Sequence, residues 1–467
     1  MKLENIIKNT GAGILHGTPS TEITSITSDS RKACPGALFI AVKGCSTDGH
    51  AYIEDAVAKG AAAVVDADRR ALALCADNFY EHPSGKLQLV GITGTNGKTT
   101  TVTLLYNMFR SLGYECGLLS TIANYVGTRR SETANTTADP ITINSLMSEM
   151  VDAGCQYCFM EVSSIGIEQE RIAGLEFKAG IFSNLTHDHL DYHKTFAEYL
   201  RCKKMFFDSL PKDAVAIINA DDKNGSVMVQ NCVAKVVAYS CRGAADHRCK
   251  ILEESFEGML LRIDGTEAWT KLTGRHNAYN ILAIYCTAIA LGTPGDEALL
   301  AISKLDPAPG RLETLHGPRD LAVVIDYAHT PDALENVLQT LRDISPEREL
   351  VCLFGCGGDR DRSKRPEMAA IAEKLADRIF VTSDNCRTED PEAIIEEIKS
   401  GFSKAGLLKT VCITDRAEAI KAAITMARPS STILIAGKGH ETYQIIGTTK
   451  HHFDEREIVN DIFEQLR

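Results

Sequence analysis

The sequence lacks a long hydrophobic run and a surplus of positive charge, and each of these absences argues against a class of protein. No stretch of about 18 uninterrupted apolar residues occurs, so the chain is predicted to have no membrane-spanning helix. The 50 Lys and Arg residues are outnumbered by 62 Asp and Glu residues, and a net charge of −12 argues against a nucleic-acid binder. Because MKLENIIKNTGAG at the N-terminus has no apolar core of signal-peptide length, we expect a cytoplasmic protein.

Paired cysteines of the kind that bind zinc are missing, as is the N-K-x-D motif that reads guanine. The 15 cysteines include one C-x-x-C, from Cys155 to Cys158, which lies in the apolar run CQYCFMEV without a second pair. We therefore interpret the cysteines as free thiols in a reducing compartment rather than as disulfides or zinc ligands. The missing guanine motif argues against a GTPase switch.

The chain is predicted to fold into three α/β domains. Its 467 residues, 44% hydrophobic and 24% charged, are typical of a globular protein with two to four domains. Strand-like runs alternate with helical stretches from about Leu87, and a second such series begins near Leu321, which predicts mostly parallel sheets. We interpret DPAPGRLE, residues 306–313, as a hinge. The predicted domains are a small α/β domain at 1–86, a central domain with a mostly parallel sheet at 87–313, and a doubly wound, Rossmann-like domain at 314–467.

A phosphate-binding loop is predicted at GITGTNGKTT, residues 91–100. The strand KLQLVGIT precedes it and the helix KTTTVTLLYNMFRSLG follows it, so backbone amides at the helix N-terminus would face phosphate oxygens. Lys98 would neutralise the outer phosphates, and the Thr99 hydroxyl could bind Mg²⁺. Ile92 stands where the strict G-x-x-x-x-G-K-[ST] pattern has its first glycine, which leaves the kind of nucleotide site open.

Acidic and histidine residues follow the next two predicted strands. Glu161 ends the apolar part of the strand QYCFMEVSS, and a carboxylate at the end of a parallel strand beside a phosphate loop is a natural Mg²⁺ ligand. Helix capping is the alternative role for this residue. The stretch SNLTHDHLDYH has three histidines and two aspartates within seven residues, which favours metal or phosphate binding over isolated structural histidines.

A buried lysine is predicted on the helix that follows. Thr195 and Glu198 in TFAE form a capping box, which fixes the helical register. In that register Lys203 is the lone cation on a face that also holds Tyr199, Leu200, Phe206 and Phe207. A desolvated amine loses its charge more easily and can then take up CO₂ to form a carbamate, which resembles a carboxylate as a metal ligand. A lysine that extends its ammonium group to water is the alternative.

Four polar loops follow predicted strands of the last domain: DYAHTPDAL, GCGGDRDRSKRP, SDNCRTEDP and GKGHETYQ. The ends of parallel strands meet at one edge of a sheet, so these loops are expected to converge. Their charged residues include Arg360, Arg362, Arg387, Lys438, Asp359, Asp384 and Glu441. This mixture suits a zwitterionic ligand, because Arg binds carboxylates in a bidentate manner and Asp or Glu can hold an amine. A solvated rim without a ligand is the alternative.

These motifs and their order resemble those of the Mur ligases. The resemblance spans essentially the whole chain and rests on GTNGKTT, EVSS, SNLTHDHLDYH with Lys203, GRHNAYN, PGRLE, DYAHTPDAL, FGCGGDRD, DNCRTEDP and GKGHETYQ. It is strongest for the members that add meso-diaminopimelate, and a phosphate loop without the first glycine is this family's own form. The resemblance implies an ATP-dependent acid–amino-acid ligase of peptidoglycan synthesis. Such an enzyme phosphorylates the terminal carboxylate of UDP-MurNAc-L-Ala-D-Glu, and an amine then attacks the acyl phosphate.

The resemblance also assigns the nucleotide and metal sites. It implies that ATP binds to Gly94, Thr95, Asn96, Gly97, Lys98, Thr99, Thr100, Asn280, Arg311 and Asp326. Two Mg²⁺ sites are implied, one at Thr99 and Glu161 and the other at His189 and carbamylated Lys203. The implied catalytic residues are therefore Lys98, Lys203, His189 and Glu161.

One set of residues is implied for each of the other two substrates. UDP-MurNAc-L-Ala-D-Glu is expected at Ser28, Ser30, Cys45, Ser46, Thr47, Asn135, Thr136, Thr137, Ser163, Gln169 and Arg171. meso-Diaminopimelate is expected at Arg360, Asp384, Asn385, Cys386, Arg387, Gly437 and Glu441. The chain departs from the family pattern with Cys386 in place of the proline of D-N-P-R and with Ile165 in place of a histidine. We expect a monomer whose domains close over the substrates.

Three alternatives stay open at this point. The same ligation with L-lysine or another diamino acid is disfavoured by Arg387, which would lack a carboxylate partner. A folylpolyglutamate-synthetase-like ligase is disfavoured by SDSR in the first domain and by the DNCR loop. A P-loop NTPase without ligase activity would leave Glu441, Arg387 and Arg360 without a role.

Overall fold

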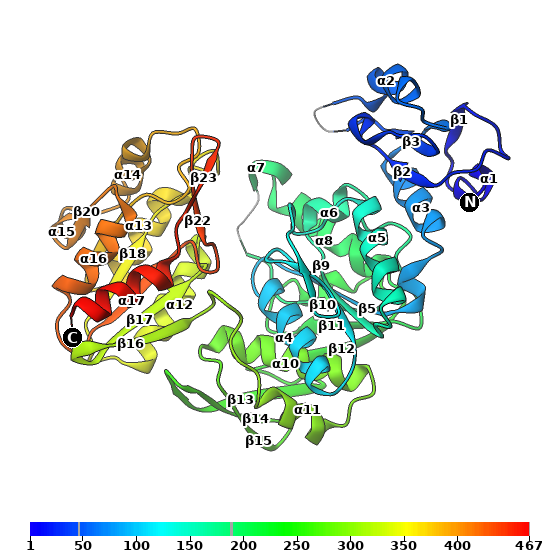
Figure 1. Ribbon diagram of the computed structural model, residues 1–467. Coiled ribbons are helices and arrows are strands. Elements are labelled where there is room, and N and C mark those ends of the chain that lie inside the picture. Colours follow the sequence, from blue (N-terminus) through cyan, green and yellow to red (C-terminus); the bar gives the residue numbers. More distant parts are fainter. Residues whose placement is uncertain (45–46, 187–189, 467) are drawn as a thin grey trace.

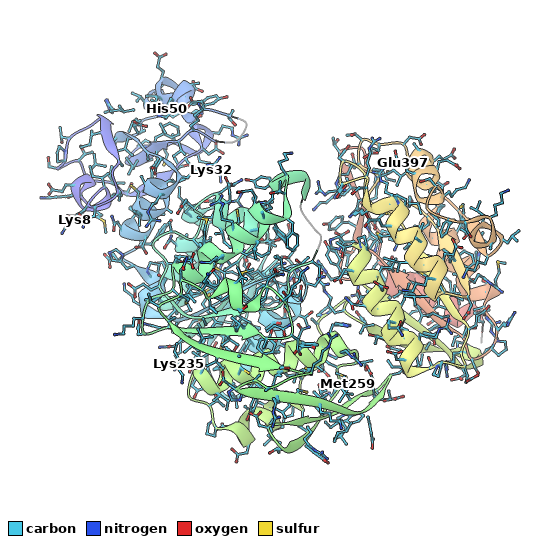
Figure 2. The ribbon with its side chains drawn as sticks, turned by 180° about the vertical axis from the view of Figure 1, so that it is seen from behind. Lys8, Lys32, His50, Lys235, Met259 and Glu397 are labelled. Atoms are coloured by element: carbon cyan, nitrogen blue, oxygen red, sulfur yellow. The ribbon has the colours of Figure 1, made fainter. Side chains whose placement is uncertain are left out.

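The computed structural model describes residues 1–44, 47–186 and 190–466, which form three large sheets with their own helices and a short two-stranded sheet (Figure 1). The N-terminal sheet, in blue, and the C-terminal sheet, in yellow to red, lie on either side of the central one. The same order is visible from behind in Figure 2. Within the described ranges, no helix is both long enough and apolar enough to cross a membrane.

The N-terminal sheet has four strands in the order β1-β4-β3-β2, of which only β1 is antiparallel to its neighbour. The strands are β1 (Gly13–His16), β2 (Ser25–Thr27), β3 (Ala37–Ala41) and β4 (Ala63–Asp66). The helices are α1 (Leu3–Ile6), η1 (Ser30–Lys32), η2 (Gly49–Tyr52), α2 (Ile53–Ala58), α3 (Arg69–Phe79) and η3 (Pro83–Lys86). All five residues of β3 are buried, so the core of this part lies on both faces of that strand.

The central sheet has 11 strands in the order β15-β14-β13-β12-β11-β10-β5-β9-β6-β7-β8. They are β5 (Gln88–Thr93), β6 (Cys116–Leu119), β7 (Asn124–Val126), β8 (Arg129–Ser131), β9 (Tyr157–Glu161), β10 (Phe177–Phe182), β11 (Val215–Asn219), β12 (Lys235–Ser240), β13 (His247–Ser255), β14 (Gly258–Ile263) and β15 (Thr266–Thr270). Pairing is parallel from β6 through to β13 and antiparallel at both ends.

Helices cover both faces of the central sheet. They are α4 (Lys98–Ser111), α5 (Pro140–Asp152), α6 (Ser164–Glu168), α7 (Leu190–His193), α8 (Phe196–Asp208), α9 (Gly225–Met228), α10 (Arg275–Ala290) and α11 (Gly295–Ile302). Side chains of α4, α10 and α11 share one hydrophobic core, whereas those of α5, α6, α8 and α9 share the other. The sheet is therefore doubly wound.

The C-terminal sheet has six strands in the order β16-β17-β21-β18-β19-β20, with β16 alone antiparallel. The strands are β16 (Glu313–Gly317), β17 (Leu321–Asp326), β18 (Leu350–Phe354), β19 (Arg378–Val381), β20 (Thr410–Cys412) and β21 (Thr432–Ala436), and the hairpin is β22 (Tyr443–Ile446) and β23 (Thr449–His452). The helices are η4 (Pro318–Asp320), α12 (Pro331–Ile344), α13 (Lys364–Leu375), α14 (Pro391–Lys399), α15 (Lys404–Leu408), α16 (Arg416–Met426) and α17 (Glu455–Gln465).

The predicted fold class, three α/β parts with mostly parallel sheets, is confirmed. The apolar runs expected as strands in the central and C-terminal parts form β5, β9, β17, β18, β19, β20 and β21. Sequence reasoning missed the antiparallel extensions of the central sheet, because their strands are short or covered on one face only and their alternation is irregular. We keep the domain bounds 1–86, 87–313 and 314–467 as a proposal, which the separation into three sheets supports.

Candidate active site

The predicted phosphate loop connects β5 to α4. Gly97 has a φ of 88°, in the left-handed region, and a Cβ at this position would lie 2.5 Å from Asn280 Oδ1. Lys98 Nζ folds back along the loop and donates to the carbonyl oxygens of Gly94 at 2.9 Å and Thr95 at 2.8 Å. Ile92 is fully buried and pairs with β9 and β10. The position of the missing glycine therefore belongs to the strand and not to the turn.

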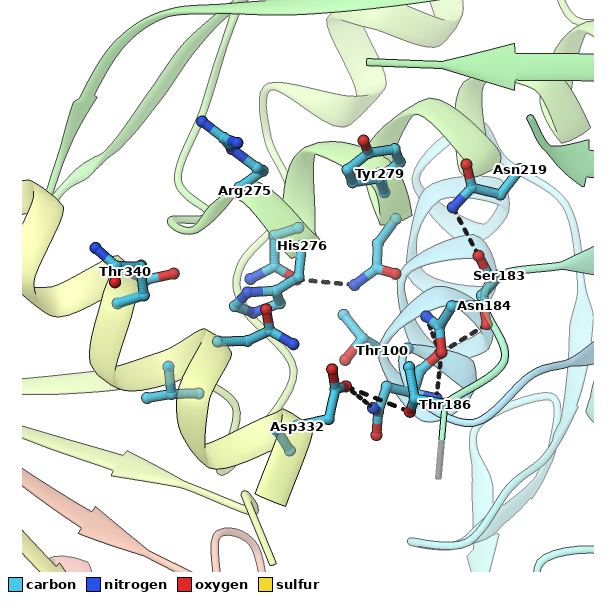
Figure 3. A pocket seen from close by; sticks show the side chains of 18 of the residues that line it. Thr100, Ser183, Asn184, Thr186, Asn219, Arg275, His276, Tyr279, Asp332 and Thr340 are labelled. Carbon is cyan, nitrogen blue, oxygen red and sulfur yellow. Dashed lines mark hydrogen bonds between the residues drawn. The ribbon is translucent and has the colours of Figure 1, made fainter. Parts of the chain in front are cut away.

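A cavity of about 540 Å³ lies between the phosphate loop, α10 and α12 (Figure 3). The predicted nucleotide residues that line it are Asn96, Gly97, Thr100, Asn280, Arg311 and Asp326. Asp326 accepts the amides of Leu312 and Ala328, both at 2.8 Å, and burial raises its pKa. Asp326 therefore connects the residue before β16, where the chain enters the C-terminal sheet, to the loop after β17.

This cavity is also lined by Asp221, His276 and Tyr279, to which the sequence analysis assigned no role of their own. Tyr279 donates to Asp221 Oδ2 at 2.8 Å, and Asp221 also accepts from Ser240 and from the amide of Cys241. Burial lowers the pKa of His276 to about 4, so this ring is neutral at pH 7. Asp221 lies two residues after the end of β11 at Asn219, so its place just beyond a strand end was the available signal.

Glu161 lies at the end of β9 with no solvent exposure. Its two oxygens accept the amide of Thr121 at 2.8 Å and the hydroxyl of Thr121 at 3.1 Å. Both donors are on Thr121, which does not begin a helix. Glu161 therefore does not act as a helix cap in this structure. Ser163 takes that role instead, because its hydroxyl accepts the amide of Gly166 at 3.0 Å.

Lys203 is buried, as the helical register predicted, and its exposed fraction is 1%. Its Nζ donates to Gly94 O at 2.8 Å and lies 4.6 Å from the centre of the Tyr199 ring. Thr195 caps α8 by accepting the amide of Glu198 at 3.2 Å. The lysine therefore reaches the phosphate loop rather than water, which contradicts the alternative of an ammonium group extended to solvent.

The predicted metal ligands are only partly within the described structure. His189 lies outside the described residues, and among those that are described no three His, Cys, Asp or Glu side chains cluster as a metal site. Glu161 and Thr99 are buried near the loop, and Lys203 Nζ touches it. Hard oxygen donors of this kind fit Mg²⁺, and a carbamate on Lys203 would add another beside Gly94.

A second cavity, of about 640 Å³, lies between the N-terminal and central parts. The predicted UDP-substrate residues that line it are Ser28, Ser30, Thr47, Asn135, Gln169 and Arg171. Thr136 and Thr137 do not line it but lie near Glu161: Thr136 Oγ1 accepts the hydroxyl of Thr121 at 3.1 Å, and Thr137 Oγ1 donates to the carbonyl oxygen of Glu161 at 2.9 Å. Cys45 and Ser46 lie outside the described residues.

A third cavity, of about 380 Å³, lies at the strand ends of the C-terminal sheet. The predicted amino-acid residues that line it are Arg360, Asp384, Asn385, Arg387, Gly437 and Glu441. Cys386 is the exception, because its side chain belongs to the hydrophobic core behind the loop. Three of the four polar loops thus contribute predicted residues to one cavity, and the first of them, DYAHTPDAL, supplies Tyr327 and His329.

A buried lysine organises the acidic side of this cavity. Lys438 has no exposed surface, and its Nζ donates to Asn385 Oδ1 at 3.0 Å and to Glu441 Oε2 at 3.2 Å. Burial would raise the pKa of Asp384, but the charges of Arg416 and Lys438 outweigh it, and the pKa is lowered. Asp384 is therefore ionised at pH 7, as an amine-binding carboxylate must be.

Ile165 also lines the third cavity, although it belongs to α6 of the central part. The sequence marked it only as a departure from the family pattern. It follows the buried Glu161 by four residues, and it gives a cavity with many charged lining residues an apolar contact. The third cavity is therefore completed by the central part of the chain.

Comparison with known families and proteins gives matches along most of the chain. Residues 22–88 match the Mur ligase family catalytic domain, 92–288 the Mur ligase middle domain and 310–439 the Mur ligase glutamate ligase domain. A protein of Phocaeicola vulgatus named UDP-N-acetylmuramoyl-L-alanyl-D-glutamate--2,6-diaminopimelate ligase is 49% identical over 99% of both chains. A protein of Clostridium tetani with the same name is 38% identical, and the match covers the whole of both chains.

Solved structures agree with these matches. A structure of UDP-N-acetylmuramoyl-L-alanyl-D-glutamate--2,6-diaminopimelate ligase has a TM-score of 0.72 and 31% identity, covering 100% of this chain and 99% of that one. A folylpolyglutamate synthase of Mycobacterium tuberculosis shares only the fold, with a TM-score of 0.63, 19% identity and coverage of 79% of this chain and 91% of that one. Family matches over all three parts and 49% identity over nearly the full length show that the chain belongs to the Mur ligase family.

Proposed function

We propose that this enzyme uses ATP to join meso-2,6-diaminopimelate to UDP-N-acetylmuramoyl-L-alanyl-D-glutamate in peptidoglycan synthesis. The observation that supports the proposal most directly is the third cavity, which is lined by two arginines, Arg360 and Arg387, and by the carboxylates of Asp384 and Glu441. A ligand with two carboxylates and two amines matches that arrangement, since each guanidinium can pair with a carboxylate. The full-length relatives named as diaminopimelate ligases support the same substrate.

The first step, in this proposal, transfers the γ-phosphoryl group of ATP to the terminal carboxylate of the UDP-linked substrate. The backbone amides of the phosphate loop and the N-terminus of α4 would hold the phosphates. Lys98 would leave the carbonyls of Gly94 and Thr95 and pair with the phosphate oxygens, where a cation offsets developing charge. Asn280 and Arg311 line the same cavity and would contact the nucleoside.

Thr99, Glu161, His189 and carbamylated Lys203 are the residues that we propose would hold Mg²⁺. When bound, Mg²⁺ would supply positive charge that stabilises the transferred phosphoryl group. Lys203 would contribute by its position, because its Nζ lies 2.8 Å from Gly94 O at the start of the loop. Glu161 is held for the same purpose by two hydrogen bonds from Thr121.

The second step joins the amine to the acyl phosphate and releases phosphate. Arg387 and Arg360 would bind the carboxylates of the incoming amino acid, and Glu441 and Asp384 would hold an ammonium group. Residues of the second cavity, among them Asn135 and Arg171, would hold the UDP-linked substrate with its carboxylate directed towards Glu161. We place this reaction in the cytoplasm and propose a monomeric enzyme.

The test is phosphate release with UDP-MurNAc-L-Ala-D-Glu, ATP and one amino acid at a time. meso-Diaminopimelate, L-lysine and L-ornithine are compared at equal concentrations, and product formation is followed by mass spectrometry. Turnover with meso-diaminopimelate well above that with L-lysine supports the proposal. Preference for L-lysine would refute the arginine argument, and ATP hydrolysis that needs no amino acid would favour an NTPase without ligase activity.

A further inference from the structure

Asp332 connects the C-terminal part of the chain to the phosphate loop. It lies in the first turn of α12, whose side chains pack in the core of the C-terminal sheet. Asn96 Nδ2 donates to Asp332 Oδ2 at 2.7 Å, and Thr186 Oγ1 donates to the same oxygen at 3.4 Å. Figure 3 shows Asp332, on α12, beside Thr186 of the central part, with dashed hydrogen bonds at the Asp332 carboxylate. One carboxylate oxygen thus receives two donors from the other side of the cleft.

Asn96 is fixed on its other side by the central part itself. Its backbone amide donates to Asn184 Oδ1 at 2.9 Å, and its carbonyl accepts from Ser183 Oγ at 2.7 Å and from Asn184 Nδ2 at 3.2 Å. The backbone of the loop is therefore anchored to the segment after β10, and the side-chain amide extends towards α12. A displacement of Asp332 would act directly on a residue of the nucleotide loop.

A purely local role for Asp332 accounts for less of this geometry. Acidic residues are common in the first turn of a helix, where they interact with its dipole. The cap of α12, however, is made by Thr330, whose hydroxyl accepts the amide of Ala333 at 3.3 Å. Burial raises the pKa of Asp332, and a half-buried carboxylate is costly unless donors compensate it. Two of those donors come from the central part of the chain.

We infer that Asp332 is a positioning residue for the ligation, which orients Asn96 and the phosphate loop when the C-terminal part lies against the central part. The consequence for catalysis rests on the proposed function, whereas the coupling itself does not. The contact joins the predicted phosphate loop to α12, and the segment between β17 and α12 lines the third cavity with Tyr327 and His329. Nucleotide and amino-acid sites are thereby linked through one hydrogen bond between side chains.

A double-mutant cycle tests the coupling. Asp332→Ala, Asn96→Ala and the double variant are compared for kcat and for the KM of ATP. Each single change should lower kcat/KM about tenfold, and the double variant should be no worse than the poorer single, because both remove the same bond. Asp332→Asn, which retains an acceptor oxygen, should lose less than Asp332→Ala. If the loss of kcat/KM in the double variant equals the product of the two single losses, the two residues act independently and the inference is overturned.

Glu335 provides a matched control on the same helix. Its side chain pairs with Lys374 at 3.3 Å on the solvent side, so Glu335→Ala removes the same charge away from the cavity. This variant should keep the activity of the parent enzyme. Equal activity of Asp332→Ala and Glu335→Ala, with both folded by circular dichroism, would show that the contact has no role.

A measurement without turnover separates the inference from the proposed function. Small-angle scattering of the ligand-free protein should give a larger radius of gyration for Asp332→Ala than for Glu335→Ala, and binding of a non-hydrolysable ATP analogue should weaken about tenfold. If no amino acid is ligated but these differences are seen, the proposed function fails and the coupling stands. Unchanged scattering together with unchanged analogue affinity would overturn the coupling, whatever the enzyme ligates.

Discussion

Replacing Arg387 with alanine should remove the preference for meso-diaminopimelate over L-lysine. The side chain is held at the third cavity by Nη1, which donates to Gly358 O at 2.8 Å and to Asn385 O at 3.3 Å. The backbone of Arg387 is held as well, because its φ of 51° is fixed by hydrogen bonds to β22 and the turn after it. The guanidinium is therefore in place before a ligand arrives.

The expected magnitude follows from the bonds that a carboxylate would lose. A hydrogen bond to a charged group contributes about 1.5–3 kcal/mol, and a bidentate pair has two of them. Because the cavity is open to solvent, we take about 3 kcal/mol for the pair, which corresponds to a roughly 100-fold lower kcat/KM for meso-diaminopimelate. L-Lysine lacks the distal carboxylate, so its kcat/KM should change by less than about threefold.

The assay is phosphate release with each amino acid, and the quantity compared is the ratio of the two kcat/KM values. Arg387→Lys keeps the positive charge but loses the planar guanidinium that can bind a carboxylate through two hydrogen bonds. Compared with Arg387→Ala, it should therefore recover only part of the preference for meso-diaminopimelate. Arg362→Ala is the control, because Arg362 pairs with Glu389 at 2.9 Å and Glu397 at 3.2 Å on the exposed side of the same loop region. An unchanged ratio in Arg387→Ala would refute the assignment of this arginine to the distal carboxylate.

Four further changes test other parts of the site. Lys203→Ala should abolish phosphate release, and short carboxylic acids added to the assay should restore part of it; no rescue would count against a carbamate. Gly97→Ala should raise the KM of ATP at least tenfold, because a Cβ would lie 2.5 Å from Asn280 Oδ1 and the φ of Gly97 is in the left-handed region. An unchanged KM would show that the loop adapts to the alanine side chain. Burial lowers the pKa of His276 from 6.5 to about 4, so on acidification the unfolded chain takes up the proton before the folded chain does. The free energy of unfolding measured in urea should therefore be highest above pH 6.5 and fall towards pH 4, and His276→Asn should reduce that fall by up to about 3 kcal/mol. Cys386→Pro should change kcat/KM for meso-diaminopimelate by less than about threefold, and a larger loss would show that the loop depends on cysteine.

Local sequence patterns were sufficient for the elements that carry the site. The phosphate loop, the strand that ends at Glu161 and the buried face of α8 all follow from periodicity and capping over fewer than about 20 residues. Contacts between the parts of the chain were not predictable in this way. Asp332 and Asn96 are 236 residues apart, and their hydrogen bond depends on how two separately folded sheets meet. The position of Ile165 at the third cavity depends on the same arrangement.

Cys386 shows why a departure from a family pattern can leave the geometry of a binding loop intact. A proline would restrict the backbone before Arg387, but here neighbouring residues supply that restriction through β22. Asn385 Oδ1 accepts the amide of Ile445 at 2.9 Å, the amide of Arg387 donates to Ile445 O at 3.2 Å, and the amide of Gly447 donates to Arg387 O at 2.8 Å. The cysteine side chain is 4% exposed and packs in the core, where a proline ring of similar size would also be apolar. These three hydrogen bonds, one at Asn385 and two at Arg387, hold the loop on both sides of position 386. The residue at 386 can therefore vary while the guanidinium of Arg387 stays at the cavity.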